Sequence, residues 1–275
     1  MGINRRFKDS VFTALFSDSE TLRELYNALG GVSLPENVPV LINTLENVLY
    51  MDLYNDISFE IGGKLIVLIE HQSSINPNMA LRLLLYISRV YEKTIKGNSI
   101  YSERQVKIPW PEFYVLYNGI RPYPDKNVLK LSELFEKPSD LGVSGKLHPL
   151  LELEVKVINI TEGRNQEIVS RCKRLSEYSA FIARAYEYRQ KEGDLDAGIK
   201  AAIKYCQKHG ILEQFLETHG SEVLNMLLTE WNTEDAKKVW YEDGLHEGME
   251  QGRKEIARRM KEKGYSPEEI ESILG

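Results

Sequence analysis

The most regular hydrophobic pattern in the chain lies in residues 55–72, with the sequence NDISFEIGGKLIVLIEHQ. β-Branched and aromatic residues precede a Gly62-Gly63 pair, and a continuous apolar run, Leu65–Ile69, follows it. This pattern predicts two antiparallel strands joined at the glycines. The second strand is apolar on both faces, so we expect it in the interior of a sheet.

The register of this hairpin decides where its polar residues lie. Glu70 and Gln72 share one face of their strand, because strand side chains alternate. A two-residue turn at Gly62-Gly63 would place Asp56 opposite Ile69, on the other face from Glu70. A three-residue loop or a glycine bulge would place Asp56 opposite Glu70, on the same face. The sequence permits either register.

The rest of residues 1–192 alternates between helical and extended patterns. Helical periodicity predicts three helices, over residues 7–29, 76–96 and 164–191. Extended patterns predict strands over residues 45–53, 112–117 and 150–160, with a brief pairing of 129–135. Pro35 and Pro39 indicate a loop over 32–44. Strands interleaved with helices predict an α/β domain, with a mixed central sheet flanked by helices.

A second region is expected after Gly193-Asp194, so that residues 193–275 form a helical C-terminal region. Its tail carries Gly244, Gly248 and Gly252 at four-residue spacing. On a helix these glycines lie roughly on one face, where another helix can approach closely. The alternative is a weakly stable solvated helix, since each glycine costs about 1 kcal/mol against alanine.

Composition limits the class of protein. The 275 residues are 42% hydrophobic and 28% charged, which is typical of a globular chain. No apolar run approaches the ~20 residues that span a bilayer, and the N-terminus lacks the apolar core of a secretory signal. Two cysteines without metal-ligand spacing indicate free thiols, and we expect a cytoplasmic location. The net charge of −6 weighs against tight DNA binding, although a local basic stripe would suffice.

The candidate chemistry lies at the ends of the hairpin. In the three-residue-loop register, the carboxylates of Asp56 and Glu70 and the amide of Gln72 converge at one edge of the sheet. Carboxylate and carbonyl oxygens suit a hard divalent cation such as Mg²⁺. The pattern D-x13-E-x-Q is a variant of the D-xn-(D/E)-x-K signature.

The chain resembles the PD-(D/E)XK nuclease superfamily, specifically the recombination-promoting nuclease (Rpn)/putative transposase family. The segments that carry the resemblance are NDISF (55–59), LIEHQSS (68–74), MALRLLLYISRVYEK (79–93), PEFYVLYNG (111–119) and KDSVFTALFSD (8–18). The resemblance covers most of residues 5–190. It implies a restriction-endonuclease-like core and a Mg²⁺-dependent DNA endonuclease that hydrolyses phosphodiester bonds, with Mn²⁺ or Ca²⁺ as substitute ions. It also implies a role in recombination, mobile elements or phage defence.

The resemblance further implies roles for individual residues. Asp56 and Glu70 would bind the metal together with the His71 carbonyl. Gln72 stands where the superfamily usually has lysine; it can orient water but adds no positive charge. Asp9 would be an auxiliary acid of the site, whereas the helix dipole alone explains an acidic residue in a first helical turn.

A basic stripe on the helix predicted over 76–96 is the candidate DNA contact. Arg82, Tyr86, Arg89 and Lys93 follow one another at spacings of four, three and four, which places them on one face. The alternative is a solvated face with extended basic side chains. A homodimer through the C-terminal region is a further expectation. Two rival functions stay open: a nucleic-acid-binding or toxin-like interaction protein with an inactive site, and an acidic edge that is purely structural.

Overall fold

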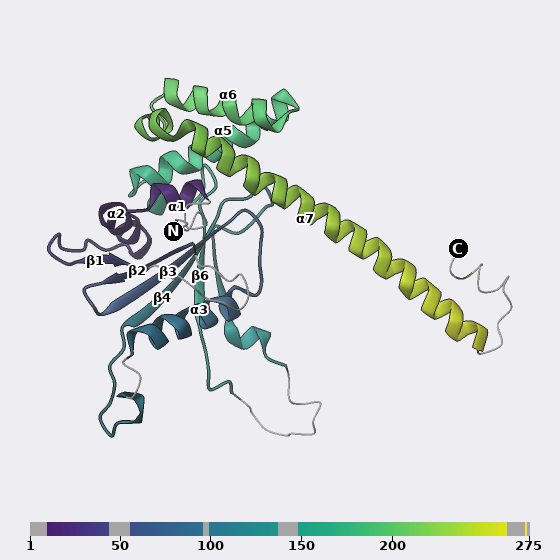
Figure 1. Cartoon of the computed structure of the whole chain (residues 1–275), viewed down its shortest axis with the longest axis horizontal. Helices are drawn as coiled ribbons and strands as arrows, with labels where there is room; N and C mark the ends of the chain where they lie inside the picture. The colour runs from purple at the N-terminus through teal and green to yellow at the C-terminus, as the bar shows by residue number, and fades with distance from the viewer. Residues whose placement is uncertain (1–9, 44–55, 96–98, 137–147, 263–272, 274–275) are drawn as a thin grey trace, which may run out of the picture. The chain divides into compact units, whose positions relative to one another are not determined.

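A six-stranded mixed sheet forms the centre of the computed structural model, which describes residues 10–43, 56–95, 99–136, 148–262 and 273 (Figure 1). In their order across the sheet, the strands are β1 (Val40–Ile42), β2 (Ile57–Ile61), β3 (Leu65–Gln72), β4 (Trp110–Tyr117), β6 (Glu154–Asn159) and β5 (Lys126–Lys130). β3, β4 and β6 are parallel, and the other pairings are antiparallel. The predicted α/β class is confirmed, and the three parallel strands end at one edge.

The β2–β3 hairpin has the register that brings the acids together. Ile61 pairs with Leu65, so residues 62–64 form a three-residue loop. Gly62 and Gly63 have φ angles of 58° and 67°, which residues with a side chain rarely adopt. Continued by one residue beyond β2, the same pairing places Asp56 opposite Glu70. The two carboxylates therefore belong to the same face of the sheet.

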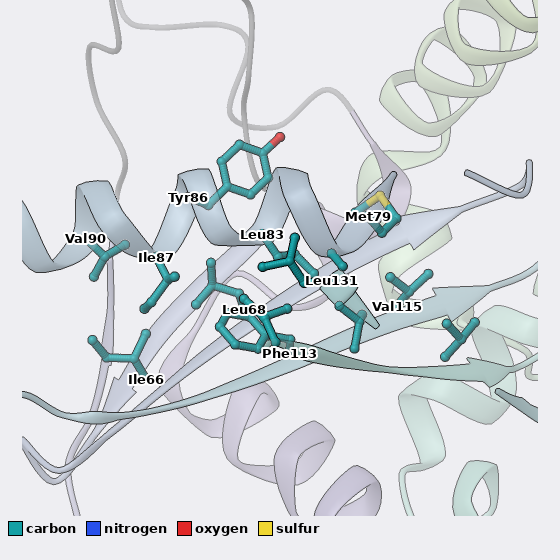
Figure 2. Packing of buried hydrophobic residues seen from close by; sticks show 14 of the residues in the cluster. Ile66, Leu68, Met79, Leu83, Tyr86, Ile87, Val90, Phe113, Val115 and Leu131 are labelled. Carbon is teal, nitrogen blue, oxygen red and sulfur yellow. The ribbon is translucent and has the colours of Figure 1, made fainter. Parts of the chain in front are cut away.

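Helix α3 (Met79–Thr94) covers that face, as Figure 2 shows. The helix and the strands beneath it bury a shared cluster that includes Ile66, Leu68, Met79, Leu83, Ile87, Val90, Phe113 and Val115. Glu70 and Gln72 follow Leu68 at two-residue steps, so they continue the same face of β3 beyond the apolar cluster. The packing of α3 thus places its first turns beside the polar end of β3.

The opposite face of the sheet carries α1 (Val11–Leu15), α2 (Ser19–Gly30) and α5 (Lys173–Glu192) (Figure 1). The ring of Tyr26 on α2 meets Phe59 of β2 edge-on at 6.4 Å, and Phe12 of α1 lies 5.5 Å from Tyr178 of α5. Residues 66–69 of β3 have no exposed surface. The prediction that this strand lies inside the sheet is therefore confirmed.

Two predicted helices are interrupted by capping side chains. The helix expected over 7–29 is divided into α1 and α2, because Asp18 accepts hydrogen bonds from backbone N–H groups of the next turn and starts a new helix. The helix expected over 164–191 is likewise divided, into α4 (Gln166–Val169) and α5, with Cys172 before Lys173. α3 begins at Met79 rather than at Asn76, whose side chain accepts a hydrogen bond from the Asn78 N–H in a preceding turn.

The strand predictions differ in three places. β1 lies inside the segment 32–44 that was expected to be a loop. With three residues, this strand is too short to show an alternating pattern in the sequence. β6 begins at Glu154, later than the predicted start at 150, and β5 occupies 126–130 before a short 3-10 helix, Leu131–Leu134. A second 3-10 turn, Ser99–Tyr101, precedes β4. The strand expected over 45–53 lies outside the described residues.

The C-terminal region is helical, with α6 (Leu195–Lys208) and α7 (Glu213–Glu262). Contacts divide the chain into two compact units, Met1–Leu224 and Asn225–Gly275, and α7 spans the division. α6 belongs to the first unit and packs on α5, and α7 continues without a break through Gly220. A domain that ends at residue 192 stays a prediction. No helix among the described residues combines the length and apolarity needed to cross a membrane.

Candidate active site at the end of strand β3

Asp56 lies immediately before β2 and is half-buried. One of its carboxylate oxygens, Oδ2, accepts a 2.6 Å hydrogen bond from the backbone N–H of His71. Burial raises the pKa of Asp56 from 3.8 to about 6, although the His71 N–H and the charge of Arg82 act in the opposite direction. The backbone of β3 therefore orients this carboxylate, while its surroundings disfavour its ionised form.

Glu70 is the most deeply buried acid of the site, with 2% of its surface exposed. Its Oε2 accepts a hydrogen bond from Arg82 Nη2 at 3.1 Å, and its buried Oε1 has no hydrogen-bond partner within the described part of the chain. Burial and the nearby Asp56 carboxylate raise the pKa of Glu70 well above its ordinary value, and Arg82 acts against them. Two neighbouring acids whose pKa values are both raised are typical of functional sites.

Gln72 lies two residues further along the same face, at the last position of β3. Its Nε2 donates to the sulfur of Met79 at 2.7 Å, so the side chain is turned toward the first turn of α3. A primary amide carries no charge. The position that the resemblance associates with lysine thus contributes hydrogen bonding without positive charge.

The side chain of His71 lies on the opposite face from Glu70, as the strand alternation predicts. Its ring stacks on Phe12 at 5.0 Å, and its Nε2 is 3.1 Å from the hydroxyl of Tyr178. Burial lowers the pKa of His71 to about 4. The imidazole is held away from the acids, which leaves the backbone carbonyl as the group of His71 that can serve as a ligand on their side.

The predicted basic stripe does not present one uniform surface. Arg82 turns into the acidic site, Arg89 is half-buried and Lys93 is exposed. Tyr86 is 1% exposed and accepts a hydrogen bond from Arg82 at 3.0 Å. Figure 2 places its ring beside α3, away from the sheet. A ring this buried is not available to stack on a base, and DNA contact by the stripe stays a prediction.

The donor set fits a hard divalent cation in part. Two carboxylates share one face with a backbone carbonyl nearby, and one buried carboxylate oxygen has no hydrogen-bond partner in the part of the chain that the structure describes, which is a suitable position for a cation. Among the described residues, no group of three or more His, Cys, Asp or Glu side chains gathers around a common point. Asp9, the further acid that the resemblance supplies, lies outside the described residues.

Sequence reasoning missed two contacts of this site. Arg82 was assigned to the DNA-facing stripe, yet its side chain contacts Glu70. The position of Arg82 in the first turn of α3 could have indicated this contact, because that turn lies beside the end of β3. The hydrogen bond between Tyr178 and His71 joins residues 107 positions apart, and no pattern in the sequence indicates it. Both contacts follow from packing of helices on the two faces of β3.

Comparisons with known proteins agree with the resemblance seen in the sequence. The profile of one family, described as "Putative transposase, YhgA-like", matches residues 9–178. That match includes both acids, α3 and the paired strands β2, β3, β4 and β6. Neither the curated proteins nor the solved structures contain a significant match. The matched segment exceeds half of the 275 residues, and the chain therefore belongs to the family of YhgA-like transposase-related proteins.

Proposed function

We propose that this protein is a metal-dependent DNA endonuclease that hydrolyses phosphodiester bonds. The observation that carries the proposal is the meeting of Asp56 and Glu70 on one face of the sheet, where one buried oxygen of Glu70 has no hydrogen-bond partner among the described residues. The pKa values of both acids stay raised although Arg82 lies beside them, so a bound cation would stabilise their ionised forms further. Family membership links the chain to recombination and mobile elements, and this link supports DNA as the substrate.

Each residue would have a distinct task. The His71 N–H fixes the orientation of Asp56. Glu70 would help to hold the ion through Oε1, which has no hydrogen-bond partner among the described residues, while its Oε2 accepts a hydrogen bond from Arg82. Gln72 can orient a water molecule through its amide. Mg²⁺, with Mn²⁺ or Ca²⁺ as substitutes, would supply Lewis acidity that neutralises negative charge on the phosphate.

A second function is favoured by one observation. Arg82 already neutralises part of the acidic charge of the site, and Gln72 lacks the positive charge of a lysine. Both features are expected of a nucleic-acid-binding or toxin-like interaction protein whose site no longer cleaves DNA. In the purely structural case, Arg82 would be the basic partner that an acidic sheet edge needs. Neither rival requires that a divalent cation bind to the site.

Plasmid nicking tests the proposal directly. Supercoiled plasmid should be nicked by the wild type with Mg²⁺ or Mn²⁺, and spared by Asp56→Asn and Glu70→Gln. Glu60→Gln is the matched control, because Glu60 lies on β2 four residues from Asp56 and on the same face. The control should nick at the wild-type rate.

Three results would decide between the functions. Nicking that survives both Asp56→Asn and Glu70→Gln would reject the assigned site. A wild type that retains DNA in a salt-dependent manner without nicking it would favour the interaction protein. A wild type whose unfolding does not respond to Mn²⁺ would favour the structural edge, since a ligand of the folded state must stabilise it.

A further inference from the structure

The proposed cleavage site lacks a source of positive charge on its own strand. Gln72 is neutral, and its amide is engaged with Met79. Hydrolysis of a phosphodiester builds negative charge on the phosphate, and fixed cations or hydrogen-bond donors nearby lower the barrier. A cation from another element would therefore complete the site.

Arg82 of α3 provides that cation among the described residues. Its Nη2 lies 3.1 Å from Glu70 Oε2, and the guanidinium charge also acts on Asp56. Met79 and Tyr86 hold the side chain in place, with Nη1 3.4 Å from the Met79 sulfur and Nη2 3.0 Å from the Tyr86 hydroxyl. The guanidinium is thus fixed beside both acids by groups of its own helix.

The geometry of this ion pair differs from that of a closed structural pair. Arginine and carboxylate groups commonly form two parallel hydrogen bonds, which satisfy both oxygens. Here Arg82 contacts Oε2, while Glu70 Oε1 and Arg82 Nε are both buried without a hydrogen-bond partner in the described region. One oxygen of Glu70 and two guanidinium N–H groups, the buried one on Nε and one on Nη1, therefore have no hydrogen-bond partner among the described residues.

The side chain of Arg82 is more exposed to solvent than that of Glu70. Its side chain is 28% exposed, against 3% for that of Glu70. A substrate that approaches from solvent would meet the guanidinium before the buried carboxylate. Guanidinium groups bind phosphate oxygens well, because their planar donors match the geometry of the phosphate.

We propose that Arg82 is the catalytic cation of this site, which contacts the scissile phosphate and supplies the positive charge that Gln72 lacks. This inference rests on the proposed nuclease function. It assigns Arg82 to the reacting phosphate rather than to the general DNA contact along α3. It also predicts that Arg82 and a bound cation act on the same phosphate and do not substitute for each other.

Three substitutions test the inference. Arg82→Met removes the charge and keeps an unbranched, apolar side chain in place of the aliphatic stem, and Arg82→Lys keeps the charge. Arg104→Met, in an exposed loop, is the control. For each protein we would measure thermal unfolding, Mn²⁺ affinity by calorimetry, and the single-turnover cleavage rate at saturating DNA and Mn²⁺. Arg82→Met should lower the cleavage rate by about 10²–10³-fold, which is typical for the loss of one such donor. Arg82→Lys should be at least about tenfold faster than Arg82→Met, because it restores a point charge.

The Mn²⁺ affinity separates a catalytic cation from a residue that merely holds Glu70. Loss of a positive charge beside two acids should leave the affinity unchanged or raise it. A weaker Mn²⁺ affinity in Arg82→Met, with a cleavage rate that excess Mn²⁺ restores, would overturn the proposal in favour of a positioning role. If Arg82→Met does not fold, Arg82→Gln takes its place in the comparison with Arg82→Lys.

The proposed function and this inference fail in different ways. A wild type that cleaves no DNA ends both. A wild type that cleaves, together with an equally fast Arg82→Met, ends the inference alone and leaves the nuclease proposal intact. Cleavage that falls equally in Arg104→Met would show a general loss of DNA contact and would also overturn the role of Arg82.

Discussion

The acid pair predicts that replacing Asp56 by asparagine stabilises the metal-free protein at neutral pH. The pKa of Asp56 is raised by burial from 3.8 to about 6. Because the folded protein holds this proton more tightly than the unfolded chain does, stability is lost as the pH rises from about 4 through about 6. A pKa difference of roughly 2 units corresponds to about 3 kcal/mol at pH 7.5.

Asparagine removes that penalty but weakens one hydrogen bond. Its amide oxygen can still accept the bond from the His71 N–H, although a neutral acceptor is weaker than a carboxylate by roughly 1 kcal/mol. The net expectation for Asp56→Asn is a gain of about 1–2 kcal/mol in the free energy of unfolding at pH 7.5. At pH 4 the folded wild type carries a protonated Asp56, so the gain should vanish or change sign.

Urea denaturation in EDTA at the two pH values measures this difference. Glu60→Gln serves as the control, and its free energy of unfolding should differ from the wild type by a similar amount at both pH values. Saturating Mn²⁺ should make the wild type more stable than Asp56→Asn at pH 7.5. A Mn²⁺ concentration of about 100 times Kd adds roughly 2.7 kcal/mol to the free energy of unfolding of a protein that binds the ion, and adds nothing for a protein that does not. An Asp56→Asn variant that is less stable than the wild type at pH 7.5 in EDTA would refute the idea that the ionised Asp56 carboxylate destabilises the metal-free fold.

Three further substitutions test the packing around the site and in the helices. Tyr178→Phe removes the hydrogen bond to His71 and keeps the ring, so calorimetry should show a loss of about 1 kcal/mol in the free energy of unfolding. The Mn²⁺ affinity should also be weaker. An unchanged affinity would show that the contacts among the rings of Phe12, His71 and Tyr178 do not influence the acids. Gly198→Ala would place a Cβ 2.6 Å from the Cα of Arg189, so urea denaturation should show a loss of about 1–3 kcal/mol. Gly252→Ala meets no atom within 4 Å and should raise the helical signal in circular dichroism by stabilising α7 by up to about 1 kcal/mol; a loss of helix would contradict this reasoning.

The sequence could predict the elements whose pattern is long and continuous. β3 was recognisable because its apolar run leaves no polar face, and α3 because its apolar residues recur at helical spacing over sixteen residues. β1 has three residues, and the break between α1 and α2 depends on one capping side chain, Asp18. Local signals of that size cannot outweigh an apolar periodicity that continues across them.

The candidate site was predictable in part for a related reason. Alternation along β3 fixes Glu70 and Gln72 on one face whatever the rest of the chain does. The position of Asp56 depends on whether the loop has two or three residues, and two glycines permit both lengths. The role of Arg82 depends on how α3 lies across β3, which is decided by the packing of Met79 and Leu83 on the sheet. The loop length and the packing of α3 on β3 depend on contacts between segments, so the sequence of one segment cannot predict them.

The ion pair of Glu70 also bears on the choice between a functional and a purely structural acidic edge. A structural edge would be most stable with both oxygens of Glu70 satisfied, because a buried polar atom without a partner costs about 1–3 kcal/mol. Arg82 has enough donors to satisfy both, yet it contacts Oε2 and leaves Oε1 unpaired among the described residues. The contacts of Met79 and Tyr86 hold the guanidinium in this position. Among the described residues, an unpaired, desolvated oxygen beside a second acid therefore supports the proposed metal site over a purely structural edge.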